Sequence, residues 1–440
     1  MMNVVICCAS HYMVPNALVA LAADAPPDRV VILCGAAEPP TRNDLNNAVL
    51  PAERLKLVLE GRKAAKAPEV VVVRAPPFDP AACRSLLIAE LTRYGVPRRI
   101  VANVTSGTTP MRFAAAQAAE AVGAEIVETV CFQPGPNRVI PLTGAAGTPQ
   151  LLASRDLLVD DYLRLHGFLS HNGPRMSWRA AEAAWRNREN VARLHAAWAS
   201  AAPAARGLLR TANALAHQND RLKNPNWLRR QATTDPENYR RLMTATPSDA
   251  LEARVCEDAA AAGLMTQDAD GGFCFVSVDA VELMGGGWFE QHVYNLVRAA
   301  LPSGIQAAPL LGLELDGDGL EWDSAAGAVT DSGDRSSRHE IDVGLFFDNQ
   351  LHVLECKTGN LTRPGTVEPL SQEAINRLAF LKKNLVGPRG MVALVHPSPP
   401  PERDEGALIA KAASENIQLW RGAEGMAAMG DWLRKLTGSP

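Results

Sequence analysis

The chain has 440 residues, of which 47% are hydrophobic and 21% are charged, and its net charge at pH 7 is −4. This length accommodates two or three globular domains, and the composition is that of a folded protein rather than a disordered one. The acidic balance excludes a uniformly basic coat for nucleic acid, so any such contact must come from a local patch.

The sequence predicts neither a membrane segment nor a secretion signal. No apolar run reaches the roughly 18 residues that a membrane span needs, and residues 1–10 lack the basic start of a signal peptide. The eight cysteines form no C-x-x-C pair and no Cys/His spacing typical of zinc. We therefore expect a cytoplasmic protein with reduced cysteines, several of which lie in apolar runs as small buried side chains.

The first 165 residues alternate short apolar runs with helical patterns. Such alternation predicts an α/β domain with a parallel, Rossmann-like sheet, and continuously apolar strands indicate a sheet covered on both faces. Strands are predicted at 3–8, 30–34, 69–74, 99–104 and 125–132, and helices at 15–23, 43–65, 80–95, 110–122 and 151–165.

Residues 166–284 form a different, mostly helical segment. Between residues 175 and 245 there are 13 Lys or Arg against 5 Asp or Glu. This basic stretch either binds a nucleic-acid backbone or forms a solvated helical face. A predicted helix at 247–263, followed by a turn and strand at 268–278, indicates a small winged-helix-like element.

Residues 285–440 read as a second α/β unit. Three glycines, 285–287, precede an amphipathic helix whose apolar positions share one face. The Gly- and Asp-rich stretch 312–337 is predicted to be an irregular loop. Strands at 340–347, 351–357, 391–396 and 417–420 and helices at 371–384 and 426–436 complete the unit.

A carboxylate-rich hairpin is the most informative part of this unit. Glu355 and Lys357 are two residues apart in a strand and therefore point to one face. If Asn349 and Gln350 form the turn, Asp342 on the preceding strand faces Lys357. If the turn is formed one residue earlier, Asp342 faces Glu355. A three-residue turn would place Asp342 on the other face unless a bulge restored it.

Charged groups on apolar strands are costly without compensation, and a divalent cation provides it. Mg²⁺ and Mn²⁺ prefer oxygen ligands, polarise phosphate and acidify a bound water. The predicted metal ligands are Asp342, Glu355 and Cys356. Lys357 would orient that water or stabilise the charge that develops on phosphorus. The alternative is a structural ion pair on a solvent face.

The order E…D…ExK resembles the PD-(D/E)xK nucleases, whose fold is that of restriction endonucleases. The strings 286–290, 340–343 and 349–358 resemble the nuclease domain of CRISPR-associated ancillary nucleases that carry an N-terminal CARF sensor domain. This resemblance implies that Glu290 assists the metal site, although an exposed helix carboxylate is the alternative. Gln372 is a weaker candidate, and His339 and His352 are interpreted as structural or surface residues.

A second motif, residues 103–112, joins a buried strand to a helix that begins near Pro110. Free N–H groups at a helix N-terminus suit an anion, and the loop after the first strand emerges at the same sheet edge. The motif matches neither a dinucleotide fingerprint nor a P-loop. A plain helix cap is the alternative explanation. The candidate ligand-binding residues are Ser10, His11, Thr105, Ser106, Gly107, Thr108, Thr109 and Arg112.

This half resembles a CARF domain, in which the loop commonly reads N-x-T-G-G-T-K-x-M. Ser106 replaces the first glycine and Thr109 replaces the lysine, so Arg112 is the candidate to meet phosphate charge. The resemblance implies a sensor of cyclic oligoadenylates, with cyclic tetra-adenylate as activator. A two-fold ligand on an isologous interface implies a homodimer.

The sequence therefore predicts three segments: a CARF domain (1–165), a helical, winged-helix-like region (166–284) and a PD-(D/E)xK nuclease domain (285–440). The predicted function is cleavage of DNA, RNA or both, with low sequence specificity, in type III CRISPR antiviral defence. Two alternatives are a ligand-sensing winged-helix transcription regulator with an idle nuclease site and an unregulated restriction or repair endonuclease. A CARF domain that slowly degrades its own ligand is compatible with the first prediction.

Overall fold

The computed structural model describes most of the chain. Some parts of the predicted elements lie outside the described residues, for example residues 43–47 and 131–132. The same holds for much of the basic stretch 175–245. The described ranges are 2–21, 27–36, 48–62, 67–93, 99–130, 138–142, 150–151, 157–171, 188–198, 211–212, 214–215, 225–301, 307–323, 328–335, 339–358, 362–363, 366–367, 369–398 and 406–438.

The chain has an α/β fold and divides into two compact units. Unit 1 comprises Met1–Pro174, Glu314–His339 and Phe346–Gln350. Unit 2 comprises Arg175–Leu313, Glu340–Leu345 and Leu351–Pro440. The division into three domains with boundaries at 1–165, 166–284 and 285–440 stays a prediction.

Unit 1 is built on a seven-stranded sheet with the order β3-β2-β1-β4-β5-β6-β7. The five neighbouring strands β3, β2, β1, β4 and β5 pair in parallel, whereas β6 and β7 add antiparallel pairs. The predicted parallel sheet is thus confirmed. The strands are β1 Asn3–Cys8, β2 Arg29–Gly35, β3 Glu69–Ala75, β4 Arg99–Asn103, β5 Glu125–Val130, β6 Arg138–Pro141 and β7 Gln150–Leu151.

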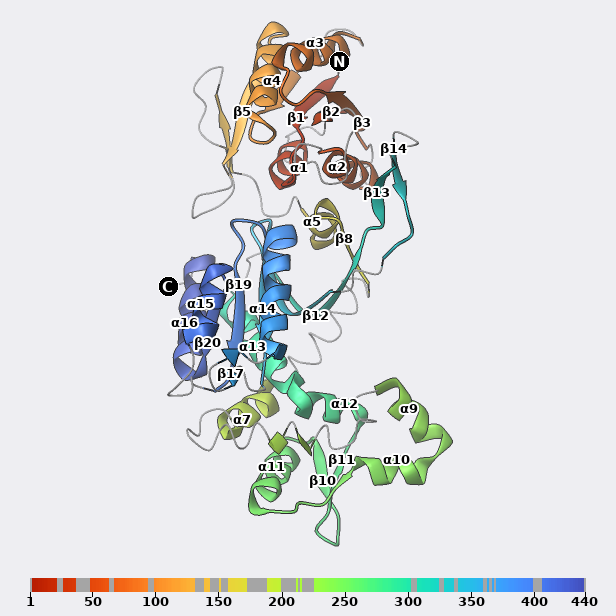
Figure 1. Ribbon diagram of the computed structural model, residues 1–440, viewed down its shortest axis with the longest axis vertical. Coiled ribbons are helices and arrows are strands. Elements are labelled where there is room, and N and C mark those ends of the chain that lie inside the picture. The colour runs from red at the N-terminus through yellow and green to blue at the C-terminus, as the bar shows by residue number, and fades with distance from the viewer. Residues whose placement is uncertain are drawn as a thin grey trace. The chain divides into compact units, whose positions relative to one another are not determined.

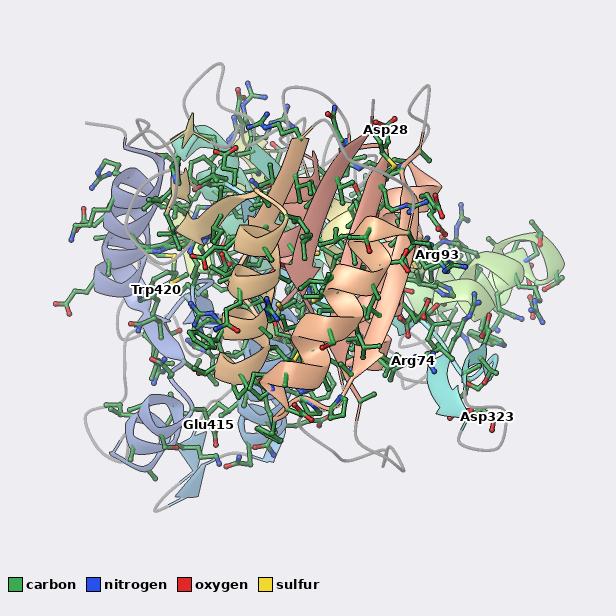
Figure 2. The ribbon with its side chains drawn as sticks, turned by 90° about the horizontal axis from the view of Figure 1, so that it is seen from above. Asp28, Arg74, Arg93, Asp323, Glu415 and Trp420 are labelled. Carbon is green, nitrogen blue, oxygen red and sulfur yellow. The ribbon has the colours of Figure 1, made fainter. Side chains whose placement is uncertain are left out.

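Helices cover both faces of the parallel part (Figure 1). On one face α3 and α4 pack side by side, with Arg93 just beyond the end of α3 (Figure 2). Ile6 and Cys8 of β1 share a buried core with Leu87 and Met111 of these helices. Burial on both faces explains why Val4–Cys8 of β1 and Val30–Cys34 of β2 are continuously apolar. The helices of unit 1 are α1 Val14–Leu21, α2 Val49–Gly61, α3 Pro80–Thr92, α4 Thr109–Ala121 and α5 Val159–Leu165.

The helix predicted over residues 151–165 is wrong in its first part. Gln150 and Leu151 form β7 instead, paired with β6, and α5 begins at Val159. An apolar residue suits an edge strand as well as a helix, and the antiparallel pairing decides between them. Arg62 pairs with Asp161 at 2.7 Å, an ion pair between the residue after α2 and the first turn of α5.

The irregular loop predicted over 312–337 is also wrong. β12 (Ala307–Gly317) continues into it, and β13 (Leu320–Asp323) pairs with β14 (Ala328–Asp331). Alternating buried leucines at 311, 313 and 315 mark the strand, but the frequent glycines and aspartates obscured this period. Within unit 1, the end of β12 pairs with β8 (Phe168–Ser170), and Arg54 binds Asp318 at 2.6 and 3.1 Å.

Unit 2 is built on a sheet in which the strands follow the order β20-β19-β16-β15-β12. β16 pairs in parallel with β19, which pairs in parallel with β20. The predicted strands and helices of the last third are therefore present, with small shifts at their ends. They are β15 His339–Phe347, β16 Gln350–Cys356, β17 Thr362–Arg363, β18 Thr366–Val367, β19 Val392–His396, β20 Gln418–Arg421, α13 Trp288–Ala300, α14 Pro369–Leu381, α15 Gly406–Ser414 and α16 Gly422–Thr437, with the π-helical segments η1 Leu283–Gly287 and η2 Lys382–Val386.

The middle of the chain contains the helix and hairpin predicted from the sequence. β10 and β11 form the hairpin after α11, and β9 completes a three-stranded antiparallel sheet. Its winged-helix character stays a prediction. The elements are α7 Arg188–Trp198, α9 Pro225–Thr234, α10 Pro236–Met243, β9 Thr244–Ala245, α11 Ala250–Ala261, β10 Met265–Gln267, β11 Phe273–Phe275 and α12 Val278–Glu282.

No helix in the described part of the chain is long and apolar enough to cross a membrane.

His352 has a structural place in unit 2, as interpreted from its position in the sequence. It is buried, its Nδ1 accepts a hydrogen bond from the backbone N–H of Met391 at 3.1 Å, and its ring packs edge-on against Trp432. Trp432 also contacts Trp420, which is labelled in Figure 2. Burial lowers the pKa of His352 to about 3, so the ring is neutral and its acceptor is preserved.

Acid should therefore destabilise unit 2. The unfolded chain binds the histidine proton near pH 6.5, whereas folded His352 binds it near pH 3. The stability that His352 contributes is complete above pH 6.5 and is lost as the pH falls towards 3, by up to about 1.4 kcal/mol per pH unit. Urea denaturation at pH 7.5 and pH 5.0 measures this loss. His352→Gln, whose amide oxygen can accept the same bond without titrating, should lose less; an equal loss would contradict the assignment.

Candidate active site and ligand loops

The β15–β16 hairpin turns at Asp348 and Asn349, whose φ angles are 49° and 58°. Positive φ at both central residues is the type I′ turn that joins antiparallel strands in a two-residue loop. β15 ends at Phe347 and β16 begins at Gln350, so this turn sets Asp342 opposite Glu355. Of the two registers that the sequence left open, the structure has the one in which the carboxylates face each other.

Asp342, Glu355 and Lys357 lie together on one face of this hairpin. Lys357 Nζ is 2.5 Å from Glu355 Oε1 and 4.0 Å from Asp342 Oδ2. Asp342 Oδ2 also accepts a hydrogen bond from the backbone N–H of Cys356 at 2.8 Å. The exposed fractions of Asp342 and Glu355 are 5% and 0%, so both carboxylates are removed from bulk water.

Arg377 is a member of this cluster that the sequence interpretation missed. It lies on α14, and its Nη2 forms an ion pair with Glu355 Oε1. The signal was its position three residues after Ala374 and one before Leu378, both buried, because this spacing places a cation at the buried face of the helix, where it needs an acidic partner. Glu355 is thus held by two cations, Lys357 and Arg377.

The electrostatics of the cluster are those of crowded acids. Burial raises the pKa of Asp342 well above its ordinary value, and the charges of Glu355 and Glu290 raise it further. Burial alone would lower the pKa of Lys357, but Glu355 and Asp342 raise it, so this lysine stays protonated. The three carboxyl groups of Asp342, Glu355 and Glu290 thus outnumber the two cations, Lys357 and Arg377, that could neutralise them.

Glu290 lies in the first turn of α13, directly after the π-helical segment η1. Gly286 adopts a φ of 139°, which favours glycine, and a Cβ there would lie 3.5 Å from Oγ1 of Thr358. The bend before α13 thus lies beside the end of β16. Burial and the charge of Glu340 raise the pKa of Glu290 to about 7, and Lys357 and Glu355 also act on it. Glu290 accordingly shares the electrostatic environment of the cluster.

The oxygen-rich cluster is suited to a hard cation. In the described part of the chain, no group of three or more histidine, cysteine, aspartate or glutamate side chains is arranged to hold a metal ion. However, Glu355 Oε2 is buried and has no hydrogen-bond partner among the described residues, which leaves an acceptor for a cation. Burial raises the pKa of Cys356 well above its ordinary value, so its thiol is neutral and a poor ligand.

Gln372, the weaker candidate, and His339, interpreted as a structural or surface residue, make other contacts. Gln372 donates to Asn376 Oδ1 on its own helix at 2.8 Å. His339 packs edge-on against Phe168 in unit 1, with ring centroids 6.1 Å apart. Both contacts agree with their interpretation as structural or surface residues.

In unit 1, the two predicted ligand loops follow the adjacent parallel strands β1 and β4. These strands lie where the strand order reverses, the edge at which open α/β sheets bind ligands. Two buried amides join the loops: Asn16 Nδ2 donates to Cys8 O at 2.7 Å, and Asn103 Nδ2 donates to Asn16 Oδ1 at 2.8 Å. Asn103 Oδ1 accepts from Thr105 Oγ1 at 2.6 Å. The two loops therefore form one hydrogen-bonded assembly.

Thr108 fulfils the alternative role of a helix cap. Its hydroxyl caps α4 at Met111 N and also donates to Pro77 O at 2.7 Å. Arg112 Nε donates to Val104 O, which ties the guanidinium to the end of β4. Loss of the Thr108 hydroxyl would therefore weaken the fold as well as any ligand contact.

The remaining predicted ligand residues differ in accessibility. Ser10 Oγ donates to Tyr12 O at 3.0 Å, and Ser106 is buried. His11 and Thr109 are exposed, and Thr105 and Gly107 are partly exposed. His11, Thr105 and Thr109 are therefore the side chains that a ligand at this edge would meet first.

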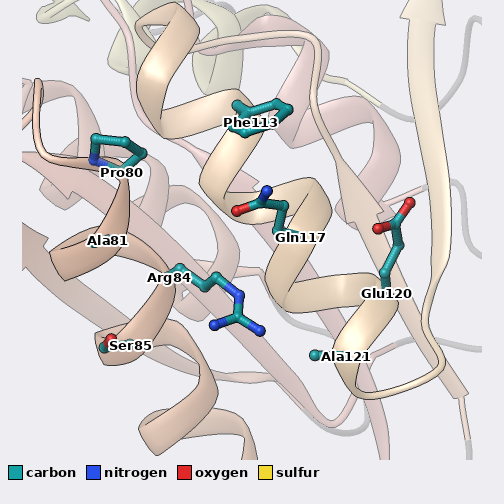
Figure 3. Close-up of a pocket in the computed structure, with 8 residues that line it drawn as sticks. All are labelled: Pro80, Ala81, Arg84, Ser85, Phe113, Gln117, Glu120 and Ala121. Carbon is teal, nitrogen blue, oxygen red and sulfur yellow. The ribbon is translucent and has the colours of Figure 1, made fainter.

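A groove lies between α3 and α4 (Figure 3). None of the predicted ligand residues lines it. Phe113, which is 59% exposed, supplies its largest apolar surface, and Arg84 and Glu120 supply opposite charges. Its lining residues are Pro80, Ala81, Arg84, Ser85, Phe113, Gln117, Glu120 and Ala121.

No protein-family model and no curated protein matches the sequence. Among solved structures, the fold is similar to that of Can2 from Sulfobacillus thermosulfidooxidans in complex with cyclic tetra-adenylate, with a TM-score of 0.64, 20% identity and 99% of each chain covered. It is also similar to protein VC1899 from Vibrio cholerae, with a TM-score of 0.67, 17% identity and 99% of each chain covered. The chain therefore shares its fold with these proteins over nearly its whole length.

Proposed function

We propose that this chain is a metal-dependent nuclease activated by a cyclic oligoadenylate and acting in type III CRISPR defence. The observation that carries the nuclease is the buried cluster of Asp342, Glu355 and Lys357 on one hairpin face. A structural ion pair on a solvent face accounts neither for two buried, facing carboxylates nor for Glu355 Oε2, which is buried without a hydrogen-bond partner among the residues that the structure describes. This cluster also favours the nuclease over a transcription regulator with an idle site.

Asp342 and Glu355 would hold Mg²⁺ or Mn²⁺, with Glu290 in support. The buried Cys356 thiol is neutral, so this residue would contribute its main-chain carbonyl oxygen. A bound metal would polarise the phosphate and acidify a water. Lys357, protonated and 34% exposed, would stabilise negative charge that develops on the phosphate, and Arg377 would hold the Glu355 carboxylate in its orientation.

The ligand loops of unit 1 support the sensor part of the proposal. They place Ser10, His11 and residues 105–109 after β1 and β4 at one sheet edge, and the Arg112 side chain of α4 donates to Val104 O just after β4. Can2, which shares the fold, was solved with cyclic tetra-adenylate, so this ligand is the first to test. A two-fold ring bound on an isologous interface would require a homodimer. Residues 1–165 would then be the CARF sensor, 166–284 a connecting winged-helix-like region and 285–440 the PD-(D/E)xK nuclease.

The deciding experiment offers the purified protein supercoiled plasmid DNA and single-stranded RNA in Mn²⁺, with and without cyclic tetra-adenylate. We expect cleavage when both ligand and metal are present and none when EDTA removes the metal. The substrate that is cleaved identifies the nuclease as acting on DNA, RNA or both. Cleavage without ligand would leave an unregulated nuclease. Sequence-specific binding in a gel shift without cleavage would favour the regulator.

A further inference from the structure

The tip of the β15–β16 hairpin belongs to unit 1, whereas the body of the hairpin belongs to unit 2. Phe346–Gln350 is part of unit 1, together with the N-terminal sheet, and Glu340–Leu345 and Leu351–Cys356 are part of unit 2. β16 begins at Gln350 and reaches Glu355 five residues later, a distance of about 17 Å along a strand. A continuous strand thus leads from unit 1 to the carboxylate cluster.

Gln350 forms a hydrogen-bonded bridge at this tip. The Tyr12 hydroxyl donates to Gln350 Oε1 at 3.2 Å, and Gln350 Nε2 donates to the Tyr162 hydroxyl at 2.9 Å. Gln350 is only 3% exposed, so its bond to Tyr162 is buried and its bond from Tyr12 is partly buried. Tyr12 directly follows Ser10 and His11 in the loop after β1. The bridge therefore starts in a loop proposed to touch the ligand.

Aromatic rings enclose the bridge. The Tyr162 ring lies 5.2 Å from that of Phe346, at the end of β15, and 4.4 Å from that of His166. Tyr12 lies 5.8 Å from His166, between ring centroids. Close-packed rings are bistable rather than compressible, so a displacement of Tyr12 would be passed to the tip rather than absorbed.

Asn349, beside Gln350 in the turn, contributes a second buried amide to the tip. Its side chain is 0% exposed, and neither its amide nitrogen nor its amide oxygen has a hydrogen-bond partner within the described ranges. A buried amide without partners is costly, so an arrangement that satisfies it can compete with the present one. A ligand can shift the conformational equilibrium of a packed element only if that element has two arrangements that the ligand binds with different affinity.

We propose that Tyr12 and Gln350 are positioning residues that couple the ligand loop after β1 to the nuclease strand β16. The inference rests on the proposed function, since it assigns the regulation of the same active site. A ligand that engages Ser10 or His11 changes the position of Tyr12, and Gln350 follows through its hydrogen bond. Because Gln350 and Glu355 belong to one strand, the seating of the tip biases the placement of Glu355 opposite Asp342.

Three variants test the coupling. Tyr12→Phe removes only the donating hydroxyl, and Gln350→Met removes the amide oxygen and nitrogen at similar side-chain volume. The third is the double variant. The quantity to measure is the ratio of cleavage rates with and without saturating cyclic tetra-adenylate. Each single variant should lower this ratio on the order of 10-fold, a typical allosteric coupling. The double variant should fall no further than the more severe single variant, because both remove one pathway. Calorimetry should show that the ligand still binds.

Tyr239→Phe on α10 is the matched control, since it removes a tyrosine hydroxyl outside the hairpin tip and should leave the ratio unchanged. If the wild-type protein responds to the ligand and the variants respond equally, the coupling is refuted while the proposed function stands. If Gln350→Met fails to fold, the milder Tyr12→Phe decides alone. A wild-type protein with no response to the ligand would overturn the proposed function, and the coupling with it.

Discussion

Replacing Glu355 by glutamine should abolish cleavage of nucleic acid while leaving ligand binding intact. Glutamine keeps the shape of the side chain but removes the charge that pairs with Lys357 and Arg377 and that would hold a metal. Loss of one group that stabilises transition-state charge typically costs about 10²–10³ in rate, so a fall of at least about 10³-fold is expected for a metal ligand. Plasmid and RNA cleavage measure the rate, and calorimetry with cyclic tetra-adenylate measures binding.

Glu424→Gln is the matched control for this variant. Glu424 is an exposed glutamate in the first turn of α16, and its charge lies outside the cluster. The Glu424→Gln variant should cleave nucleic acid at the wild-type rate. Glu355→Ala should also be inactive, but it leaves two cations beside a cavity, so its stability should fall as well. Cleavage retained by Glu355→Gln would show that the active site has been assigned to the wrong residues.

Replacing Gly107 by alanine should destabilise unit 1 and abolish its response to the ligand. Its φ of 94° is strained for any residue with a Cβ, and that Cβ would lie 2.7 Å from Cβ of Cys8, closer than such atoms approach. The loop after β4 would have to move away from the end of β1, which separates the two ligand loops. We expect about 2–5 kcal/mol of lost stability from strain and overpacking together, measured by urea denaturation, and a loss of activation by the ligand.

Gly123→Ala separates strain from crowding. Gly123 also has a positive φ, 71°, but a Cβ there would have no neighbour within 4 Å. It should lose only about 1–2 kcal/mol, the cost of the left-handed conformation, and should keep its response to the ligand. Equal effects of the two substitutions would mean that the close approach of Gly107 to Cys8 has no influence on the ligand loops.

Local patterns account for what was correctly predicted. Residues Val4–Cys8 of β1 and Val30–Cys34 of β2 are continuously apolar, because central strands of a parallel sheet buried on both faces select apolar residues at every position. The E-x-K pair could be placed on one face because strand periodicity is strict. The loop 312–337 failed for the opposite reason: its glycines and aspartates resemble a turn-rich segment, and the pairing partners of β12, β13 and β14 are distant in sequence or hidden by that composition.

Arg377 and the seating of the hairpin tip lay beyond the reach of sequence patterns. Arg377 meets Glu355 across the packing of α14 on the sheet, 22 residues away. Gln350 meets Tyr162 across 188 residues and Tyr12 across 338. Such contacts depend on how layers stack, which periodicity within one segment does not encode.

By itself the sequence determined that the chain is an α/β protein and that Asp342, Glu355 and Lys357 are candidates for one site, because helix and strand periods and turn residues act over a few neighbours. Tertiary structure alone decided that Asp342 faces Glu355 rather than Lys357, since a positive φ at Asp348 and Asn349 selects the turn. It also decided that Arg377 joins the carboxylates and that the hairpin tip lies in unit 1, since long-range packing brings those side chains together.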